Sequence, residues 1–292
     1  MSALTRFKTA FTLMKDSLLL MRHHPRLFLF PIVSSIAGIA FMAVFIGFVF
    51  GGLALQPEGG NVLMASLIIA LLVVYLITTF VSVFFTAGLV HQTREALGGN
   101  AVSLRAGMAG AWDVKMPLFI WALISATIGV ILSSIEDSNS GVARIIGTLF
   151  GLAWTLLTFL IIPVIVFEEP SVREMFRSSA ESFRDTWGET PISLAGVGVL
   201  SLAVALPFAG PGIVLLESTG FSILGFGLIA TGAVLGAIVS QTFKGVIKTS
   251  LYFYATDGTL PAEFDDIDPT ALARDQPTTG SNATSGMSGG LR

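Results

Sequence analysis

The chain has 292 residues, of which 53% are hydrophobic and only 12% are charged, and its mean hydropathy is +0.82. Soluble domains carry about 25% charged residues, so this composition is typical of an integral membrane protein. The net charge of −3 argues against nucleic acid as a partner, because nucleic acid binding needs a basic surface. The absence of cysteine excludes disulfides, iron–sulfur clusters and thiolate zinc sites.

The first segment is an amphipathic stretch that precedes every long apolar run. Its apolar residues recur at alternating spacings of three and four, which predicts one stripe on a helix with Asp16 off the stripe. The stripe consists of Leu4, Phe7, Phe11, Met14, Leu18 and Met21. Five basic residues accompany it, namely Arg6, Lys8, Lys15, Arg22 and Arg26. Each basic residue near an anionic membrane surface adds about 1 kcal/mol of attraction, so we expect this helix to lie in the membrane interface.

Six continuous apolar runs follow, and each is long enough to cross a bilayer as a helix of about 20 residues. They cover residues 27–50, 62–90, 116–135, 142–167, 190–216 and 221–243. The runs do not alternate as strands would, and a helix satisfies its own backbone in lipid. The sequence therefore predicts an all-α, polytopic bundle of six transmembrane helices over residues 1–260. Residues 261–292 are acidic and poor in apolar side chains, which predicts a disordered cytoplasmic tail.

The basic residues predict the direction of the spans. If the N-terminus is inside, 15 of the 16 Lys and Arg residues fall on the inner side, and Arg144 alone falls outside. The positive-inside rule then places both termini in the cytoplasm of a multi-pass plasma-membrane protein.

Two further amphipathic segments are expected on the inner side. Residues 103–117, SLRAGMAGAWDVKMP, place Leu104, Met108, Ala111 and Trp112 along one side of a short helix. Residues 167–189, FEEPSVREMFRSSAESFRDTWGE, form an island of charge in an apolar chain. Their predicted apolar side consists of Val172, Phe176, Ala180, Phe183 and Trp187. Ser171 and Glu174 fit a capping box, and Arg177 can pair with Glu181 on the helix surface.

Each amphipathic segment is followed by two apolar runs. We therefore predict three units, each an interfacial helix followed by a membrane hairpin, which suggests a threefold internal repeat. The expected contacts with lipid and the interface are Phe7, Lys8, Phe11, Met14, Lys15, Arg22, Arg26, Trp112, Phe176, Phe183 and Trp187. In the third segment the acids balance the arginines, so Arg173, Arg177 and Arg184 are instead candidates for contact with a protein partner.

Catalytic and cofactor-binding patterns are missing from the sequence. The predicted spans have no ionisable residue near their centres, where coupled transporters usually need one. No nucleophile elbow, zinc motif, phosphate loop or nucleotide fingerprint occurs, and we expect neither a cofactor nor a metal ion. Glu168 and Glu169 could form a carboxylate pair, but a solvated membrane exit is the simpler interpretation.

Small residues and prolines suggest close helix packing. Gly147 with Gly151 and Gly232 with Gly236 have GxxxG spacing, which favours tight packing inside the bundle over dimerisation. LPFAGPG at residues 206–212 suggests either a broken helix around a cavity or, preferably, an early helix end and a short outer loop.

The third segment also carries a family resemblance. Its pattern resembles that of a group of uncharacterised prokaryotic membrane proteins, in which a Pro-Val-containing span end and a Glu precede an amphipathic helix with a Ser pair and a terminal Trp-Gly. The positions here are Pro163, Val164, Val166, Glu168, Ser178, Ser179, Trp187 and Gly188, and LYFYATDGTLPAEFD at 251–265 resembles the closing signature of the group. The resemblance covers about residues 1–265 and implies six helices with no assigned activity. The acidic tail hints at a salt-adapted archaeal member. A looser similarity reaches the membrane domain of some glycerophosphodiester phosphodiesterases.

The functional hypothesis is a non-enzymatic membrane protein that organises membrane lipids or a protein partner at its cytoplasmic face. The alternative is a permease component with a polar cavity around Trp154, Gln241 and the Pro207–Pro211 segment.

Overall fold

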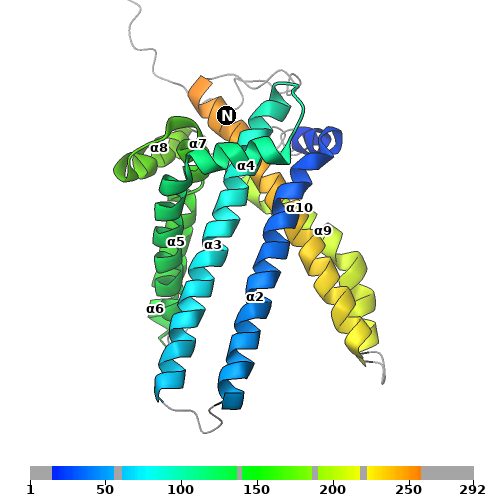
Figure 1. Ribbon diagram of the computed structural model, residues 1–292. Coiled ribbons are helices and arrows are strands. Elements are labelled where there is room, and N and C mark those ends of the chain that lie inside the picture. Colours follow the sequence, from blue (N-terminus) through cyan, green and yellow to red (C-terminus); the bar gives the residue numbers. More distant parts are fainter. Residues whose placement is uncertain (1–14, 56–60, 137–139, 186–189, 218–221, 258–292) are drawn as a thin grey trace, which may run out of the picture.

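The computed structural model (Figure 1) describes residues 15–55, 61–136, 140–185, 190–217 and 222–257. Residues 15–23 are helical and lead through a short 3-10 turn, η1 (Pro25–Phe28), into the first long helix. The helices that follow are α2 (Leu29–Leu55), α3 (Asn61–Leu97), α4 (Leu104–Asp113), α5 (Lys115–Glu136), α6 (Gly141–Leu157), α7 (Ile161–Glu168), α8 (Val172–Asp185), α9 (Thr190–Glu217) and α10 (Ser222–Asp257). Within these described residues there is no strand. The predicted all-α fold is confirmed.

Within the part of the chain that the structure describes, six helical stretches are long and apolar enough to cross a membrane, as the sequence predicts. They are Pro25–Gly52, Met64–Leu97, Lys115–Ile135, Gly141–Glu168, Gly196–Glu217 and Ser222–Phe253. The second and sixth continue well beyond their predicted ends at residues 90 and 243, because the helix persists where the sequence turns polar. Charged residues such as Arg94 and Lys248 therefore stand on the ends of these long helices and not in loops.

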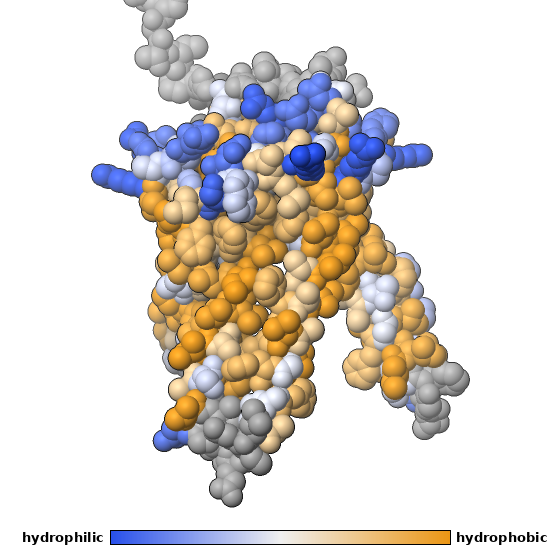
Figure 2. All heavy atoms as spheres, in the orientation of Figure 1, coloured by the Kyte–Doolittle hydropathy of each residue, from blue (hydrophilic) through white to orange (hydrophobic). Residues whose placement is uncertain are grey.

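Three helical hairpins share one end of the molecule with the short helices. The hairpins are α2–α3, α5–α6 and α9–α10, and Figure 1 shows α4 and α8 lying across the end where α3 and α10 finish. The helix at residues 15–23 lies at this same end, to the right in the view. Figure 2 shows hydrophilic residues gathered there, while the rest of the visible face is mostly hydrophobic. We call this region the charged end. Along the chain, a short helix precedes a hairpin three times, which is the order predicted from the sequence.

The buried core sits near the charged end. One cluster joins Phe30, Leu89, Leu160, Phe243 and Leu251, which come from α2, α3, the turn before α7, and α10. A second cluster packs between α3, α4, α5, α7 and α8 and includes Val90, Ala111, Leu118, Ile165 and Met175. Toward the opposite end the hairpins separate, most clearly α9–α10 from α2–α3 (Figures 1 and 2), and their large apolar side chains are exposed. Such surface is expected where lipid, not protein, covers a helix.

Glycines allow the helices of a hairpin to approach closely. A Cβ added at Gly232 would lie 2.9 Å from the Ala205 carbonyl oxygen, and one at Gly236 would lie 2.9 Å from that of Ser201. The Ser201 hydroxyl donates a hydrogen bond of 3.1 Å to the Gly236 carbonyl across the same contact. Both GxxxG pairs face their own hairpin, since Gly147 likewise meets Ile135 of α5. The predicted packing inside the bundle is confirmed.

The proline-rich stretch of the fifth span does not end or break its helix. Pro207 and Pro211 both lie inside α9, which continues to Glu217, so the preferred expectation of an early end and an outer loop is wrong. An interior proline removes one backbone hydrogen bond, a defect that membrane helices tolerate when neighbouring groups compensate. Here α10 packs closely on this part of α9, where Gly212 approaches the Gly225 carbonyl oxygen. The helix is therefore held by its hairpin partner.

Candidate functional site

The charged end is the candidate site, because the described residues that were singled out from the sequence gather there. Of the expected lipid contacts, Phe7, Lys8, Phe11, Met14 and Trp187 lie outside the described residues, as does the side chain of Phe183. The side chain of Arg184, an expected partner contact, lies outside them too. Lys15, Arg22, Arg26, Trp112, Arg173 and Arg177 are exposed, and Phe176 is half-buried. Most of the described members of the set therefore present polar or aromatic groups at the surface.

The helix at residues 15–23 is buried along Ser17, Leu20 and Met21, and Asp16 is 9% exposed. Of the predicted apolar stripe, Met21 is buried and Leu18 is exposed. Contact of the stripe with lipid stays a prediction. Leu20 and Met21 join the main core beside η1, and this packing decides which side faces inward.

Helix α4 lies on α2 and α3 through its glycines. A Cβ at Gly107 would come within 2.5 Å of the Phe30 ring, and one at Gly110 within 2.5 Å of His91. The buried side therefore contains Gly107 and the predicted Ala111, whereas Leu104 is half-buried and Met108 is exposed. Trp112 is displaced outward and is 60% exposed, with the Lys115 ammonium 5.0 Å from the centre of its ring.

A polar contact fixes the loop that leads into α4. The buried Gln92 side chain accepts a hydrogen bond of 2.7 Å from the Ser103 backbone N–H. Arg26 donates to the Val102 carbonyl oxygen at 3.3 Å, which ties the start of the first span to the same loop. Ser103 in turn caps α4, since its hydroxyl accepts from the Ala106 N–H. These contacts connect η1 and α3 with the loop before α4.

The predicted fourth span consists of two helices, α6 and α7. It is interrupted between Leu157 and Ile161, and Pro163 lies in the first turn of α7. A proline is tolerated in a first turn because the N–H groups there have no partner within the helix. The interruption leaves the Leu157 carbonyl without its usual partner, and the hydroxyl of Ser179 on α8 donates to it at 2.7 Å. The third interfacial helix is thus joined directly to the break in the span.

The orientation of α8 follows from that contact. Met175 and Ser179 are fully buried and Ser182 is 9% exposed, while Val172 is 40% exposed. The buried side is therefore rotated by about one residue from the predicted Val172–Phe176–Ala180 side, because the two serines are turned toward the bundle. Phe176 remains in contact with it, since its ring lies 5.9 Å from both Trp121 and Trp154.

The outer side of α8 carries its charges. Glu174 accepts hydrogen bonds from the Ser171 N–H at 3.0 Å and from the Ser171 hydroxyl, so the acidic half of the predicted capping box is present. These hydrogen bonds, and then Arg177, lower the pKa of Glu174 below its usual 4.5. The predicted pair of Arg177 and Glu181 is present at 2.9 Å between exposed side chains, and it raises the pKa of Arg177. Such an exposed pair contributes little to stability.

The two adjacent glutamates have structural partners. Glu168 accepts a hydrogen bond of 2.9 Å from the Tyr252 hydroxyl of α10. Glu169 adopts a left-handed backbone conformation with φ of 48°, and it ends α7 before Pro170. Phe167 stacks on Tyr252, and the Arg94 guanidinium lies 5.5 Å from the Phe167 ring. Across the described residues, no three His, Asp or Glu side chains gather closely enough to hold a metal ion.

The residues suggested for a permease cavity lie in separate places. Trp154 stacks on Trp121 with ring centres 5.8 Å apart. Gln241 borders a void of about 10 Å³ together with Pro31, Ser34 and Phe85, which is just enough for one water molecule. The Pro207–Pro211 segment belongs to an unbroken helix in another hairpin.

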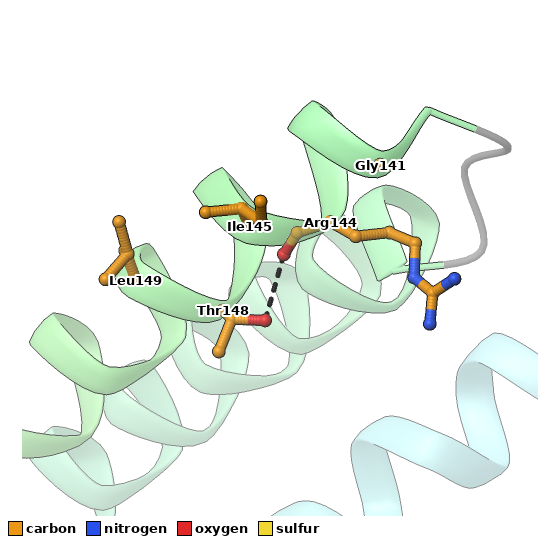
Figure 3. A pocket seen from close by; sticks show the side chains of 5 residues that line it. All are labelled: Gly141, Arg144, Ile145, Thr148 and Leu149. Atoms are coloured by element: carbon orange, nitrogen blue, oxygen red, sulfur yellow. Dashed lines mark hydrogen bonds between the residues drawn. The ribbon is translucent and has the colours of Figure 1, made fainter.

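A larger hollow lies at the opposite end. It has a volume of about 390 Å³ and is lined by residues of α6 alone, among them Arg144, Thr148 and Leu149. Figure 3 shows the Arg144 side chain extending away from Leu149, while the Thr148 hydroxyl donates back to the Arg144 carbonyl at 2.9 Å. All of the lining comes from one helix, so it is a surface groove and not an enclosed site.

Comparison with known proteins decides the family. Residues 62–261, about two-thirds of the chain, match the family of unknown function DUF6159. The chain belongs to DUF6159. The resemblance to an uncharacterised family is thereby confirmed. No curated protein and no solved structure matches the chain, and the looser similarity to glycerophosphodiester phosphodiesterases stays a prediction.

The DUF6159 match places most of the charged end within the family region. It begins at the start of α3 and extends past the end of α10, so it contains α4, the interrupted span and α8. Trp112 and the third interfacial helix were predicted from the sequence. The roles of Ser179, Tyr252 and Arg94 were not predicted, because their partners lie far away in the chain.

Proposed function

We propose that this DUF6159 protein is a non-enzymatic plasma-membrane protein that organises lipid at its cytoplasmic face through its interfacial helices. The observation that carries the proposal is the surface of α4 and the start of α5. Trp112 is 60% exposed and Met116 66% exposed, and the Lys115 ammonium stands over the Trp112 ring. An aromatic ring, an apolar side chain and a cation together are typical of residues at the level of the lipid headgroups.

The cytoplasmic placement rests on charge. Arg144 is alone among the 16 Lys and Arg residues in falling on the other side of the proposed membrane. Inner leaflets are anionic, and basic residues within a Debye length of the surface are attracted to them. The interfacial helices would thus lie among anionic headgroups.

The non-enzymatic character rests on the engagement of the polar groups that could act as acids or bases. Glu168 is held by Tyr252, and the adjacent Glu169 completes a turn. A general acid–base pair would need to converge on a position that a substrate can reach. Two successive residues at a helix end do not provide that geometry.

Native mass spectrometry of the full chain, extracted with its own lipid, tests the proposal. We expect retained phospholipid on the wild-type protein and less of it on a W112A/M116A variant. A matched L149A/F150A variant removes exposed apolar side chains of α6 outside the charged end, and it should retain more lipid. Retention that is equal in both variants would contradict the proposal. A bound solute or a co-purifying subunit in place of lipid would favour the permease or partner hypothesis.

A further inference from the structure

The last membrane helix carries a line of exposed residues whose polarity changes along its length. Val234, Ala237, Gln241, Lys244 and Lys248 follow one another at spacings of three and four, so they share one face of α10. The first four are exposed and Lys248 is half-buried. From Ala237 to Lys248 the helix rises about 16 Å, over which the face passes from apolar to amide to cationic. This is the order of groups that a phospholipid presents from its chains to its phosphate.

The position of this face is fixed by the bundle. Gly245, on the adjoining side of α10, packs against α3 so closely that a Cβ there would lie 2.5 Å from Leu89. This contact keeps the two lysines from turning toward α3. At the upper end, the Lys248 ammonium lies 4.8 Å from the centre of the Phe159 ring, beside the interruption of the fourth span. The cationic group is therefore held at a defined place near the charged end.

The two lysines carry charge that the described acidic residues do not balance. Within the part of the chain that the structure describes, the only side-chain ion pair closer than 4.0 Å joins Arg177 to Glu181. Neither lysine has a hydrogen-bonded carboxylate there, and an aromatic ring does not neutralise an ammonium group. Both lysines belong to a helical stretch that is apolar enough to span a membrane. Unbalanced cations at that level attract anions.

We infer that Lys244 and Lys248 bind the phosphate of an anionic phospholipid, with Gln241 at the level of its glycerol esters and the apolar part of the face along its acyl chains. The inference rests on the proposed lipid association and adds to it the class of headgroup and the residues that hold it. Two ammonium groups at neighbouring positions of a helix suit a phosphate with net negative charge, whereas a zwitterionic headgroup would bring its own cation to them. A line of lipid-facing apolar residues would bind any lipid alike.

The test is a titration of the delipidated full chain in detergent with phosphatidylglycerol or phosphatidylcholine, followed by native mass spectrometry. A basic residue near an anionic headgroup gives about a fivefold gain in binding, so K244Q/K248Q should bind phosphatidylglycerol about 30-fold more weakly. The charge-retaining K244R/K248R variant should bind within a few fold of wild type. The single variant K244Q should bind phosphatidylglycerol about fivefold more weakly. R144Q removes one exposed charge at the opposite end of the molecule and should behave as wild type.

Each result decides the inference. Equal loss of binding in K244Q and R144Q would assign the effect to net charge, and equal binding of the two lipids would show that the anionic headgroup is not recognised. Either result would overturn the inference. Competition by inorganic phosphate alone, without need of acyl chains, would do so too. In those cases the protein still retains lipid and the proposed function stands, whereas a wild-type protein that binds neither lipid would overturn both. Thermal unfolding of K244Q/K248Q and K244R/K248R, measured in parallel, is the check that both variants are folded.

Discussion

The link between Ser179 and the interrupted fourth span gives a sharp prediction for stability. The Ser179 side chain is fully buried, and its hydroxyl is 2.7 Å from the Leu157 carbonyl oxygen. S179A removes the donor to this part-buried carbonyl, and the loss of the hydrogen bond costs about 0.5–1.5 kcal/mol of the free energy of unfolding. The neighbouring Ser178 is half-buried and belongs to the same serine pair, so S178A is a matched control with an expected change below about 0.5 kcal/mol.

The measurement is unfolding at equilibrium in mixed micelles with an increasing fraction of a denaturing detergent, followed by tryptophan fluorescence. Trp121 and Trp154 report on the region directly, because both rings contact Phe176 of the same helix as Ser179. A loss of stability in S179A but not in S178A supports the assignment. Equal effects of the two substitutions, or no effect of S179A, would refute the idea that α8 supports the interruption.

Two further predictions concern α4 and α8. Gly107→Ala should destabilise the protein by about 1–3 kcal/mol, because its Cβ would overlap a packed ring. Gly38→Ala has open space around it and should be neutral or stabilising by up to about 1 kcal/mol. The same unfolding assay checks both variants. For Glu174, hydrogen bonds from Ser171 lower the pKa in the folded state. The stability that they contribute is present above the unfolded pKa, near 4.5, and is lost as the pH falls through the lower folded value. The stability difference between wild type and E174Q should therefore shrink on acidification, and a difference that grows would contradict this sign.

The number and approximate limits of the spans could be predicted from the sequence, because the apolar runs are long and the helix is the structure that lipid permits. The three interfacial helices could be placed for the same reason, since each combines charge with a helical spacing of apolar residues. Their buried sides could not be predicted to the residue. In α8 two serines are buried in place of Val172, because a distant carbonyl needs a donor, and in α4 glycines face the bundle because α2 and α3 lie so close.

The prolines did not mark helix ends consistently. Pro163 accompanies an interruption that hydropathy does not reveal, since the residues on either side remain apolar. Pro207 and Pro211 look like a stronger break in the sequence, yet the helix continues through them beside α10. Whether a proline ends a membrane helix depends on what its neighbours can supply, and this information is tertiary. The two lysines of α10 are four residues apart in the sequence. The predicted sixth span ended at residue 243, so the sequence did not place them on the same helix as the span.

The direction of the protein in the membrane is the most direct test of the account, because the interfacial helices can organise inner-leaflet lipid only if the charged end faces the cytoplasm. The natural chain has no cysteine, so single substitutions give a clean background for labelling. Arg177→Cys on α8 and Arg144→Cys on α6 lie at opposite ends and are both exposed in the folded protein. We predict that a membrane-impermeant maleimide labels Arg144→Cys on intact cells and labels Arg177→Cys only after the membrane is opened. Labelling of Arg177→Cys on intact cells, with Arg144→Cys protected, would contradict it.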